Sequence, residues 1–266
     1  MGRKVSIIGC GWLGLPLAKS LSDQGYSVKG STTRTEKLEA VKATGAEPFL
    51  IRLGEKEGDL AKMLDTEILI VTIPPSKQGG LYMEQMEVLA KAADGSNVSK
   101  VIYISATSAY PLNGKEVREE DAERVISRFS DIVWLDVEAL FMENRSFDAT
   151  VVRFSGLMGD YYQPGRYFSG KEIKGAENPV NMIHQDDCVA ILSEIIRQDA
   201  WNEVFNASAD EHPTKREFYG KACEAIGVEP PVFVEGRQPF RIVNSEKMKK
   251  RLDYKFIHPN PAEAFD

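Results

Sequence analysis

The chain has 266 residues, of which 42% are hydrophobic and 27% are charged, and its formal net charge is −7. This composition is typical of a globular protein in water, and the length suffices for one α/β domain with a small appended lobe. The negative charge is not offset by a dense cluster of lysine and arginine, which argues against a nucleic-acid partner. No segment is long and apolar enough to predict a membrane span.

Cysteines and histidines are few and widely spaced. They are Cys10, Cys188, Cys223, His184, His212 and His258. An odd number of cysteines without CxxC spacing favours a reducing, cytoplasmic compartment. No histidine stands at ligand spacing to another along the chain, so the sequence predicts no metal site.

Strand-like and helix-like segments alternate over the first 160 residues, as in a parallel sheet with helices on both faces. Strands are predicted over 5–8, 26–29, 48–53, 67–72, 101–105 and 150–154. Helices are predicted from 14 to 21 and over 36–43, 60–64, 81–93 and 134–143. The predicted class is α/β, with a doubly wound parallel-sheet Rossmann fold.

The pattern changes after Gly159, where a loop rich in Tyr, Gly and Pro runs to about residue 180. Further elements are predicted over 187–197 (helix), 203–206 (strand), 215–226 (helix) and 246–252 (helix). Thr214 and Glu217 form a capping-box pattern before the helix at 215, and Gly227 follows its end. We therefore predict an NAD(P)-binding core over 1–160 and a small mixed α/β, substrate-binding lobe over 161–266, of which 180–210 returns to the core.

The glycines of GCGWLG are the most informative residues in the chain. Gly9, Gly11 and Gly14 follow an apolar strand and open a helix-length apolar pattern. In this context the first glycine permits a tight turn, the second lets the backbone approach a pyrophosphate, and the third lets helix and strand lie close. The N–H groups at the helix start then face the phosphates. The pattern predicts dinucleotide binding.

The end of the second predicted strand indicates which dinucleotide is bound. NAD-binding proteins usually carry an acidic residue there, which accepts hydrogen bonds from the ribose. This chain has Ser31, Thr32 and Arg34 instead, and these side chains could bind a 2′-phosphate. The sequence predicts NADP(H) as the preferred cofactor. The alternative is a solvated loop in which Arg34 faces water.

Five segments in order resemble the extended and atypical short-chain dehydrogenase/reductases, in particular the NAD-dependent epimerase/dehydratase-like group. They are GCGWLG (9–14), VTIPP (71–75), YISATSAY (103–110), RFSGLMG (153–159) and NMIHQDD (181–187). The resemblance covers nearly the whole chain. It implies further cofactor contacts from Trp12, Leu13, Thr72, Ile73, Pro74, Ser105, Phe154, Ser155 and Gly156.

The resemblance also implies a catalytic Tyr-x-x-x-Lys pair on the helix after the fifth strand, and this chain departs from it. Aligning Glu138 with the glutamate of that helix places Ser130 and Trp134 where the Tyr and Lys should stand. The pair is therefore predicted to be absent. The usual catalytic Ser or Thr of the fifth strand falls on Ala106, for which Ser105, Thr107 or Ser108 could substitute; we favour Thr107.

A Tyr-x-x-x-Lys spacing occurs at Tyr167 and Lys171, in the loop expected to cover the substrate. It is either a displaced catalytic pair or a chance match in a Tyr-rich loop. Tyr161 and Tyr162 could also supply an acid, whereas Tyr110 matches a packing position of the resembling family.

Arg166, Asn181 and His184 are predicted to border the substrate. His184 could act as a base held by Asp186 or Asp187, or these residues could serve only to start a helix.

Two functions remain open. The first is an NAD(P)-dependent oxidoreductase or epimerase-like enzyme that acts on a small polar, sugar-derived substrate with an unusual proton-transfer group; the sequence favours this enzyme. The second is a non-catalytic NADP(H)-binding sensor of redox state or metabolites. Hydroxyacid or prephenate-type dehydrogenases are more distant, because they append an all-helical domain. Either a monomer or a homodimer is compatible with the sequence.

Overall fold

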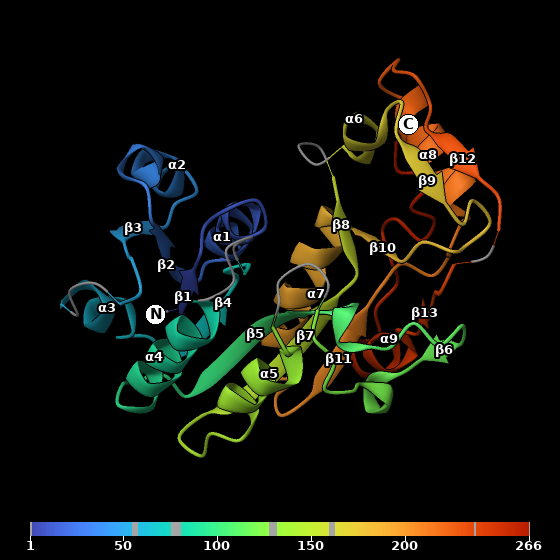
Figure 1. Ribbon diagram of the computed structural model, residues 1–266. Helices are drawn as coiled ribbons and strands as arrows, with labels where there is room; N and C mark the ends of the chain where they lie inside the picture. The colour runs from blue at the N-terminus through green and yellow to red at the C-terminus, as the bar shows by residue number, and fades with distance from the viewer. Residues whose placement is uncertain are drawn as a thin grey trace. The chain divides into compact units, whose positions relative to one another are not determined.

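A computed structural model describes residues 2–54, 58–75, 81–127, 132–159, 163–236 and 238–265 (Figure 1). The chain divides into two compact units. The first comprises residues 1–109, 124–152 and 191–204, and the second comprises 110–123, 153–190 and 205–266. The predicted functional boundary near residue 160 stays a prediction. In the structure the chain passes between the units several times.

A seven-stranded sheet forms the centre of the fold. Its strands are β1 (Lys4–Ile8), β2 (Ser27–Thr32), β3 (Glu47–Leu50), β4 (Ile68–Val71), β5 (Lys100–Ala106), β7 (Asp148–Phe154) and β11 (Val204–Ala207). Their order is β11-β7-β5-β4-β1-β2-β3. The pairs β1–β2, β1–β4, β2–β3 and β4–β5 are parallel. Because the strand order reverses direction at β1, the predicted doubly wound Rossmann fold is confirmed.

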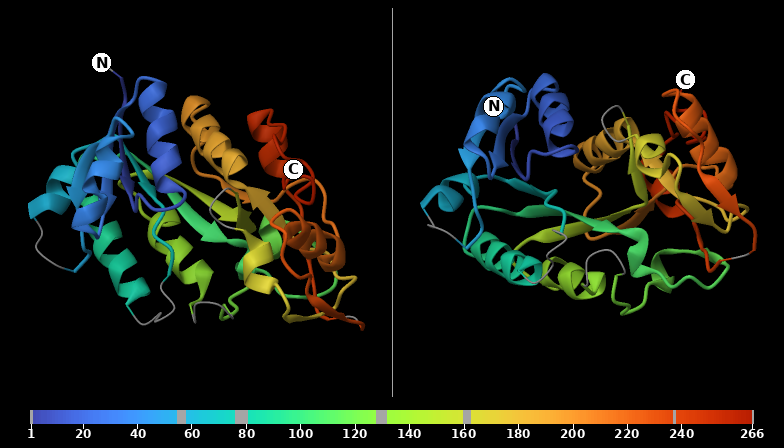
Figure 2. Two further views of the ribbon diagram at one scale, coloured as in Figure 1. Left: turned by 90° about the horizontal axis from the view of Figure 1, so that it is seen from above. Right: turned by 45° about the horizontal axis from the view of Figure 1, so that its top comes forward.

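Helices cover the sheet of the first unit on both faces. They are α1 (Gly14–Asp23), α2 (Leu38–Lys42), α3 (Gly58–Met63), α4 (Tyr82–Asp94) and α5 (Trp134–Met142), with short 3-10 turns η1 (Thr35–Lys37) and η2 (Thr107–Ala109). Figure 2 shows α4 and α5 side by side on one face and α1 on the other. Both faces of β4 are therefore covered, and all four of its residues are buried, as expected of a central parallel strand.

The second unit is a mixture of short strands and helices. It contains β6 (Glu116–Val117), η3 (Glu119–Asp121), β8 (Gly156–Met158), α6 (Pro164–Phe168), β9 (Glu172–Lys174), β10 (Met182–His184), α8 (Lys215–Glu224), β12 (Val232–Val234), β13 (Ile242–Val243) and α9 (Glu246–Leu252). The helix α7 (Gln185–Arg197) begins in this unit and ends in the first. One buried cluster of this unit brings together Met158, Val180, Met182, Phe218 and Ala262.

Two boundary predictions can be compared directly with the structure. The start of α8 is confirmed, because the Thr214 hydroxyl accepts a hydrogen bond from the Glu217 backbone N–H at 3.1 Å. The predicted end of the second strand at Lys29 is wrong: β2 continues to Thr32, with Ser31 paired to Phe49 of β3. No helix within the described ranges has the length and apolarity needed to cross a membrane.

Candidate functional site

The glycine-rich turn follows β1 and leads into α1, as predicted. Gly9 has φ +107°, a backbone conformation that favours glycine. A Cβ on Gly14 would lie 2.4 Å from the carbonyl oxygen of Gly9, so only glycine fits where the helix begins. These two glycines shape the turn itself.

Gly11 has a different role from its two neighbours. It is exposed, and a Cβ placed on it would meet only the Gly9 carbonyl oxygen, at 4.0 Å. Nothing within the protein therefore requires glycine at this position. A close approach by a ligand would require it, which fits a pyrophosphate lying against the backbone.

The start of α1 is open to an anion. The residue before it, Leu13, has no side chain that could cap the helix, and the first turn contains no acidic residue. The first N–H groups of a helix have no partner within the helix, and its dipole favours negative charge at this end. Together with the exposed Gly11, these groups fit the diphosphate of a dinucleotide.

Two neighbouring strands hold the turn. The Ser31 hydroxyl of β2 accepts a hydrogen bond from the Gly9 N–H at 3.0 Å. The Thr72 hydroxyl, directly after β4, donates to the Gly9 carbonyl at 2.7 Å. Both side chains were predicted to contact the cofactor, and in the structure each is bonded to the turn that would bind it.

Two further residues were predicted to bind the 2′-phosphate: Thr32, which ends β2, and Arg34, which lies just beyond it. Thr32 is buried and its hydroxyl accepts a hydrogen bond from the Arg34 N–H at 3.2 Å. The side chain of Arg34 is exposed. No acidic residue lies between Ser27 and Arg34, so the end of β2 lacks the carboxylate that would repel a 2′-phosphate.

At the end of β5, Ser105 and Glu138 form a buried pair. The Ser105 hydroxyl donates to Glu138 Oε1 at 2.6 Å, and both side chains are almost completely buried. Thr107 is also buried, in the turn η2. Because the Ser105 hydroxyl donates its proton to Glu138, Thr107 remains the better candidate for a hydroxyl that donates a hydrogen bond to a substrate oxygen. Sequence reasoning used Glu138 only to align the helix and did not predict this pairing.

A pair of tyrosines lies in the same unit. The Tyr82 hydroxyl donates to the Ile73 carbonyl at 3.0 Å and is 3.1 Å from the Tyr103 hydroxyl. Burial raises the pKa of Tyr82 to about 12 and raises the pKa of Tyr103 well above its ordinary value. A phenol with so high a pKa is a poor base near neutral pH.

Trp134, at the position of the expected catalytic lysine, is the first residue of α5. It is buried, and its ring meets that of Tyr82 edge-on, with 6.3 Å between centroids. Ser130, at the position of the expected tyrosine, lies outside the described residues, as do Tyr161 and Tyr162. The position aligned with the lysine therefore carries no cation.

The pair Tyr167 and Lys171 does not lie on one helix, because α6 ends at Phe168. The Lys171 ammonium lies over the Tyr167 ring, 3.8 Å from its centroid, and the side chain of Tyr167 is 65% exposed. This is the geometry of a cation–π contact. An ammonium that lowers the pKa of a phenol would lie beside its oxygen instead.

In the second unit, the residues predicted to contact the cofactor lie at the end of β7 and directly after it. Phe154 and Ser155 are buried, and the Ser155 hydroxyl has no hydrogen-bond partner among the residues that the structure describes. Gly156 is exposed, yet a Cβ on it would lie 2.5 Å from the sulfur of Met182. A buried hydroxyl without a partner is rare and is consistent with a ligand contact.

Asn181 and Arg166 were predicted to contact the substrate. The Asn181 side chain donates to the Arg241 carbonyl at 3.0 Å and accepts from the Val243 N–H at 2.8 Å. It therefore holds the segment that contains β13. Arg166 is exposed on α6.

Tyr110 is buried, which agrees with the packing position expected from the resemblance. Its hydroxyl accepts a hydrogen bond from Arg153 Nη1 at 2.7 Å and donates to Asn206 Oδ1 at 2.5 Å. Burial raises its pKa to about 12.

Comparisons with known proteins agree with this site. Residues 4–130 match the family model of the NAD binding domain of 6-phosphogluconate dehydrogenase. In fold, the chain is similar to UDP-glucuronic acid 4-epimerase from Bacillus cereus in complex with UDP-glucuronic acid and NAD (TM-score 0.80, 16% identity, 98% of this chain and 96% of that one). The chain therefore contains a segment that matches an NAD binding domain and has the fold of an epimerase solved with NAD, which confirms the predicted resemblance at the level of the fold.

Two further matches extend over nearly the whole chain. One is Protein YeeZ from Escherichia coli strain K12, which is 28% identical over 268 residues that cover 97% of each protein. The other is MoeE5 in complex with UDP-glucuronic acid and NAD (TM-score 0.82, 18% identity, 98% of this chain and 96% of that one). The structural match to MoeE5 continues past residue 130, so the likeness in fold extends over the second unit, which contains strands as well as helices.

Proposed function

We propose that this protein is an NADP(H)-dependent oxidoreductase or epimerase-like enzyme that acts on a small, polar, sugar-derived substrate. The observation that carries the proposal is the turn from Gly9 to Gly14, which presents backbone N–H groups at the start of α1 while Gly11 leaves room for a ligand. A bound nicotinamide nucleotide would supply the hydride chemistry. The residues of the chain bind and orient it.

The preference for NADP(H) rests on the end of β2. The Ser31 and Thr32 hydroxyls each accept a hydrogen bond within the protein, whereas Arg34 is exposed and carries the positive charge that would attract a 2′-phosphate. A guanidinium suits a phosphate, because it is permanently charged and can donate two hydrogen bonds at once.

This preference is tested by calorimetry with NADPH and NADH on the wild type and on Arg34→Glu. The substitution should weaken NADPH binding at least tenfold and leave NADH binding nearly unchanged. Arg145→Glu, which makes the same charge change at another exposed arginine, should alter neither. Tighter binding of NADH than of NADPH by the wild type would contradict the proposal.

The substrate class is supported by the two solved structures of similar fold, which are both complexes with UDP-glucuronic acid. We propose Thr107 as the hydroxyl that orients the substrate, with Arg166, Asn181 and His184 on the substrate side. The wild type should convert a member of a nucleotide-sugar panel. An oxidoreductase would do so with net oxidation of NADPH or reduction of NADP⁺, and an epimerase would form the epimer with no net change of the cofactor. Thr107→Val, which keeps the shape of this buried side chain, should lower kcat without loss of cofactor binding.

One observation favours the alternative of a non-catalytic NADP(H)-binding sensor. The position aligned with the catalytic lysine holds a buried tryptophan, Trp134. If the wild type binds NADPH but turns over no member of the panel, and Thr107→Val changes nothing, the sensor is the better account.

We also propose a reducing, cytoplasmic location. All three cysteines lie within the described chain, and each is buried and free of any disulfide. This pattern is usual in compartments that keep thiols reduced.

A further inference from the structure

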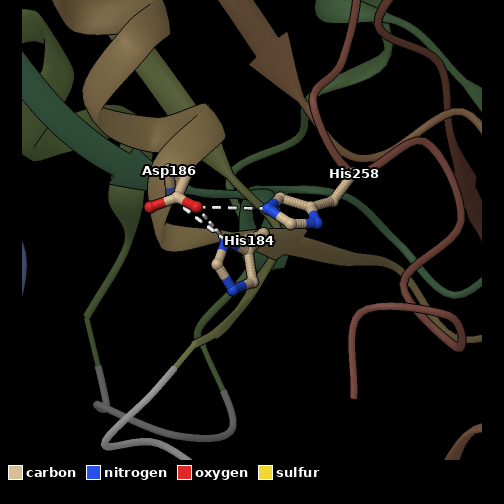
Figure 3. Close-up of side chains that lie close together, drawn as sticks. All are labelled: His184, Asp186 and His258. Carbon is tan, nitrogen blue, oxygen red and sulfur yellow. Dashed lines mark hydrogen bonds and ion pairs between the residues drawn. The ribbon is translucent and has the colours of Figure 1, made fainter. Parts of the chain in front are cut away.

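Two histidines and one carboxylate converge in the second unit, where His258 meets His184 and Asp186 from a distant part of the chain (Figure 3). His184 ends β10, Asp186 lies in the first turn of α7, and His258 follows α9. The Asp186 Oδ2 atom is 3.3 Å from His184 Nδ1 and 3.2 Å from His258 Nε2. The two imidazole rings have centroids 3.9 Å apart. The ligand atoms of the three residues all lie within 4.8 Å of one another.

One ring nitrogen of His184 lies beside two polar atoms of Asp186. His184 Nδ1 is 3.2 Å from the Asp186 backbone nitrogen and 3.3 Å from Asp186 Oδ2. In the tautomer that carries its proton on Nε2, Nδ1 presents a lone pair, as the carboxylate oxygen does. A cation between these two atoms would then be attracted by both.

The two separations from the Asp186 oxygen match the spacing of ligand atoms around a metal ion. Zinc binds histidine nitrogen and carboxylate oxygen at about 2.0–2.2 Å, so neighbouring ligand atoms around a tetrahedral ion are about 3.3–3.5 Å apart. The two separations from Asp186 Oδ2 are 3.3 and 3.2 Å. Little movement would be required to accommodate an ion.

We propose that His184, Asp186 and His258 form a binding site for a divalent transition-metal ion, with zinc as the best match. Two imidazoles and one carboxylate are ligands that zinc commonly uses, whereas magnesium and calcium prefer oxygen alone. The Asp186 side chain is 59% exposed, so water can occupy a fourth position. Binding of an ion by these three residues does not require a bound dinucleotide.

A neighbouring carboxylate prepares the site. Asp187 is completely buried; its Oδ1 accepts from the Tyr254 hydroxyl and the Ile257 N–H, each at 2.7 Å, and its Oδ2 accepts from the His258 N–H at 3.1 Å. These three bonds fix the backbone of His258 against the start of α7. Asp187 is thus a positioning residue. A bound metal would form a second connection between α7 and the same C-terminal segment.

The site is tested by titrating the chelator-treated, full-length protein with Co²⁺, followed by visible absorption and then by Zn²⁺ competition. We expect one equivalent to bind with the absorption of a low-symmetry cobalt site, and Zn²⁺ to displace it and raise the Tm. His258→Ala should weaken binding by more than the roughly ten- to hundredfold that changes in outer-shell residues cause.

Asp186→Asn gives a second test, because it removes the carboxylate with little change of shape at an exposed position. The matched control is His212→Gln, which alters a histidine outside the cluster and should bind Co²⁺ like the wild type. Absence of the cobalt spectrum from the wild type would overturn the proposal. So would unchanged affinity in both His258→Ala and Asp186→Asn. NADPH binding, measured on the same samples, tests the proposed function separately.

Discussion

The Ser31 hydroxyl accepts the N–H of Gly9 at 3.0 Å, while the Ser31 carbonyl accepts the N–H of Cys10 at 2.7 Å. One residue of β2 thus orients two consecutive amides of the glycine-rich turn. Thr72 bonds the Gly9 carbonyl from the other side, after β4. The turn is held in its conformation before any ligand arrives, which lowers the entropic cost of binding.

Ser31→Ala is expected to weaken both the turn and the fold. It leaves the Gly9 N–H without its partner, and the loss of one such hydrogen bond costs about 1 kcal/mol. Urea unfolding should therefore show a decrease of that size in the free energy of unfolding, and calorimetry should show weaker binding of NADPH and NADH alike. A selective loss of NADPH binding would instead mean that the Ser31 hydroxyl contacts the 2′-phosphate.

Gly14 and Gly11 should respond differently to substitution by alanine. Gly14→Ala places a Cβ 2.4 Å from the Gly9 carbonyl oxygen, so helix and strand must separate. A decrease of unfolding free energy of about 1–3 kcal/mol is expected for such overpacking. Gly11→Ala meets no atom closer than 4.0 Å and should unfold at the same temperature as the wild type. Equal stabilities for the two variants would contradict the geometry of the turn.

The thiols should not react in the folded protein. Burial raises the pKa of Cys10 to about 12 and also raises the pKa values of Cys188 and Cys223. At pH 8 only about one Cys10 side chain in ten thousand is then a thiolate, the reactive form. A colorimetric thiol reagent should label three cysteines in guanidinium and none rapidly without it. Rapid labelling of one thiol in the native protein would contradict this burial.

His212 should make folding sensitive to acid. Burial lowers its pKa below 6.5, outweighing the Val180 carbonyl and the attraction of Glu116 and Asp210. The unfolded chain therefore binds a proton on this residue at a pH where the folded protein does not. Stability contributed by neutral His212 is present above about pH 6.5 and is lost as the pH falls toward the folded pKa.

Urea unfolding of the wild type and of His212→Gln between pH 8 and 5 measures this effect. The stability of the wild type should fall more steeply below pH 6.5, because the variant lacks the titrating group while the rest of the chain is the same. If the stabilities of the two proteins depended on pH in the same way, burial would not lower the pKa of His212.

Local patterns explain which parts of the fold were predictable. The turn at Gly9 to Gly14 and the cap at Thr214 depend on neighbouring residues and follow directly from the sequence. The end of β2 was misplaced, because Gly30 resembles a strand end, whereas packing needs glycine there: a Cβ would lie 2.7 Å from the Cys10 sulfur.

Contacts between distant residues left no such pattern. Ser245 stands directly before α9, where a serine commonly caps a helix, but no side-chain capping bond forms there, and its hydroxyl donates to the Ser208 carbonyl at 2.9 Å. The strands β9 and β12 are three residues each and pair across a long stretch of chain. His184 and His258 likewise come together only through the fold, so ligand spacing along the sequence could not reveal them.

The most direct test of the whole account is calorimetry of NADPH binding to the wild type and to Gly11→Val. Gly11 has room for a side chain within the protein, so the variant should fold normally while its isopropyl group occupies the place of the pyrophosphate. We predict saturable binding of NADPH to the wild type and at least a hundredfold weaker binding to Gly11→Val. Failure of the wild type to bind either NADPH or NADH, or equal affinities of wild type and variant, would contradict the assignment of this turn to a dinucleotide.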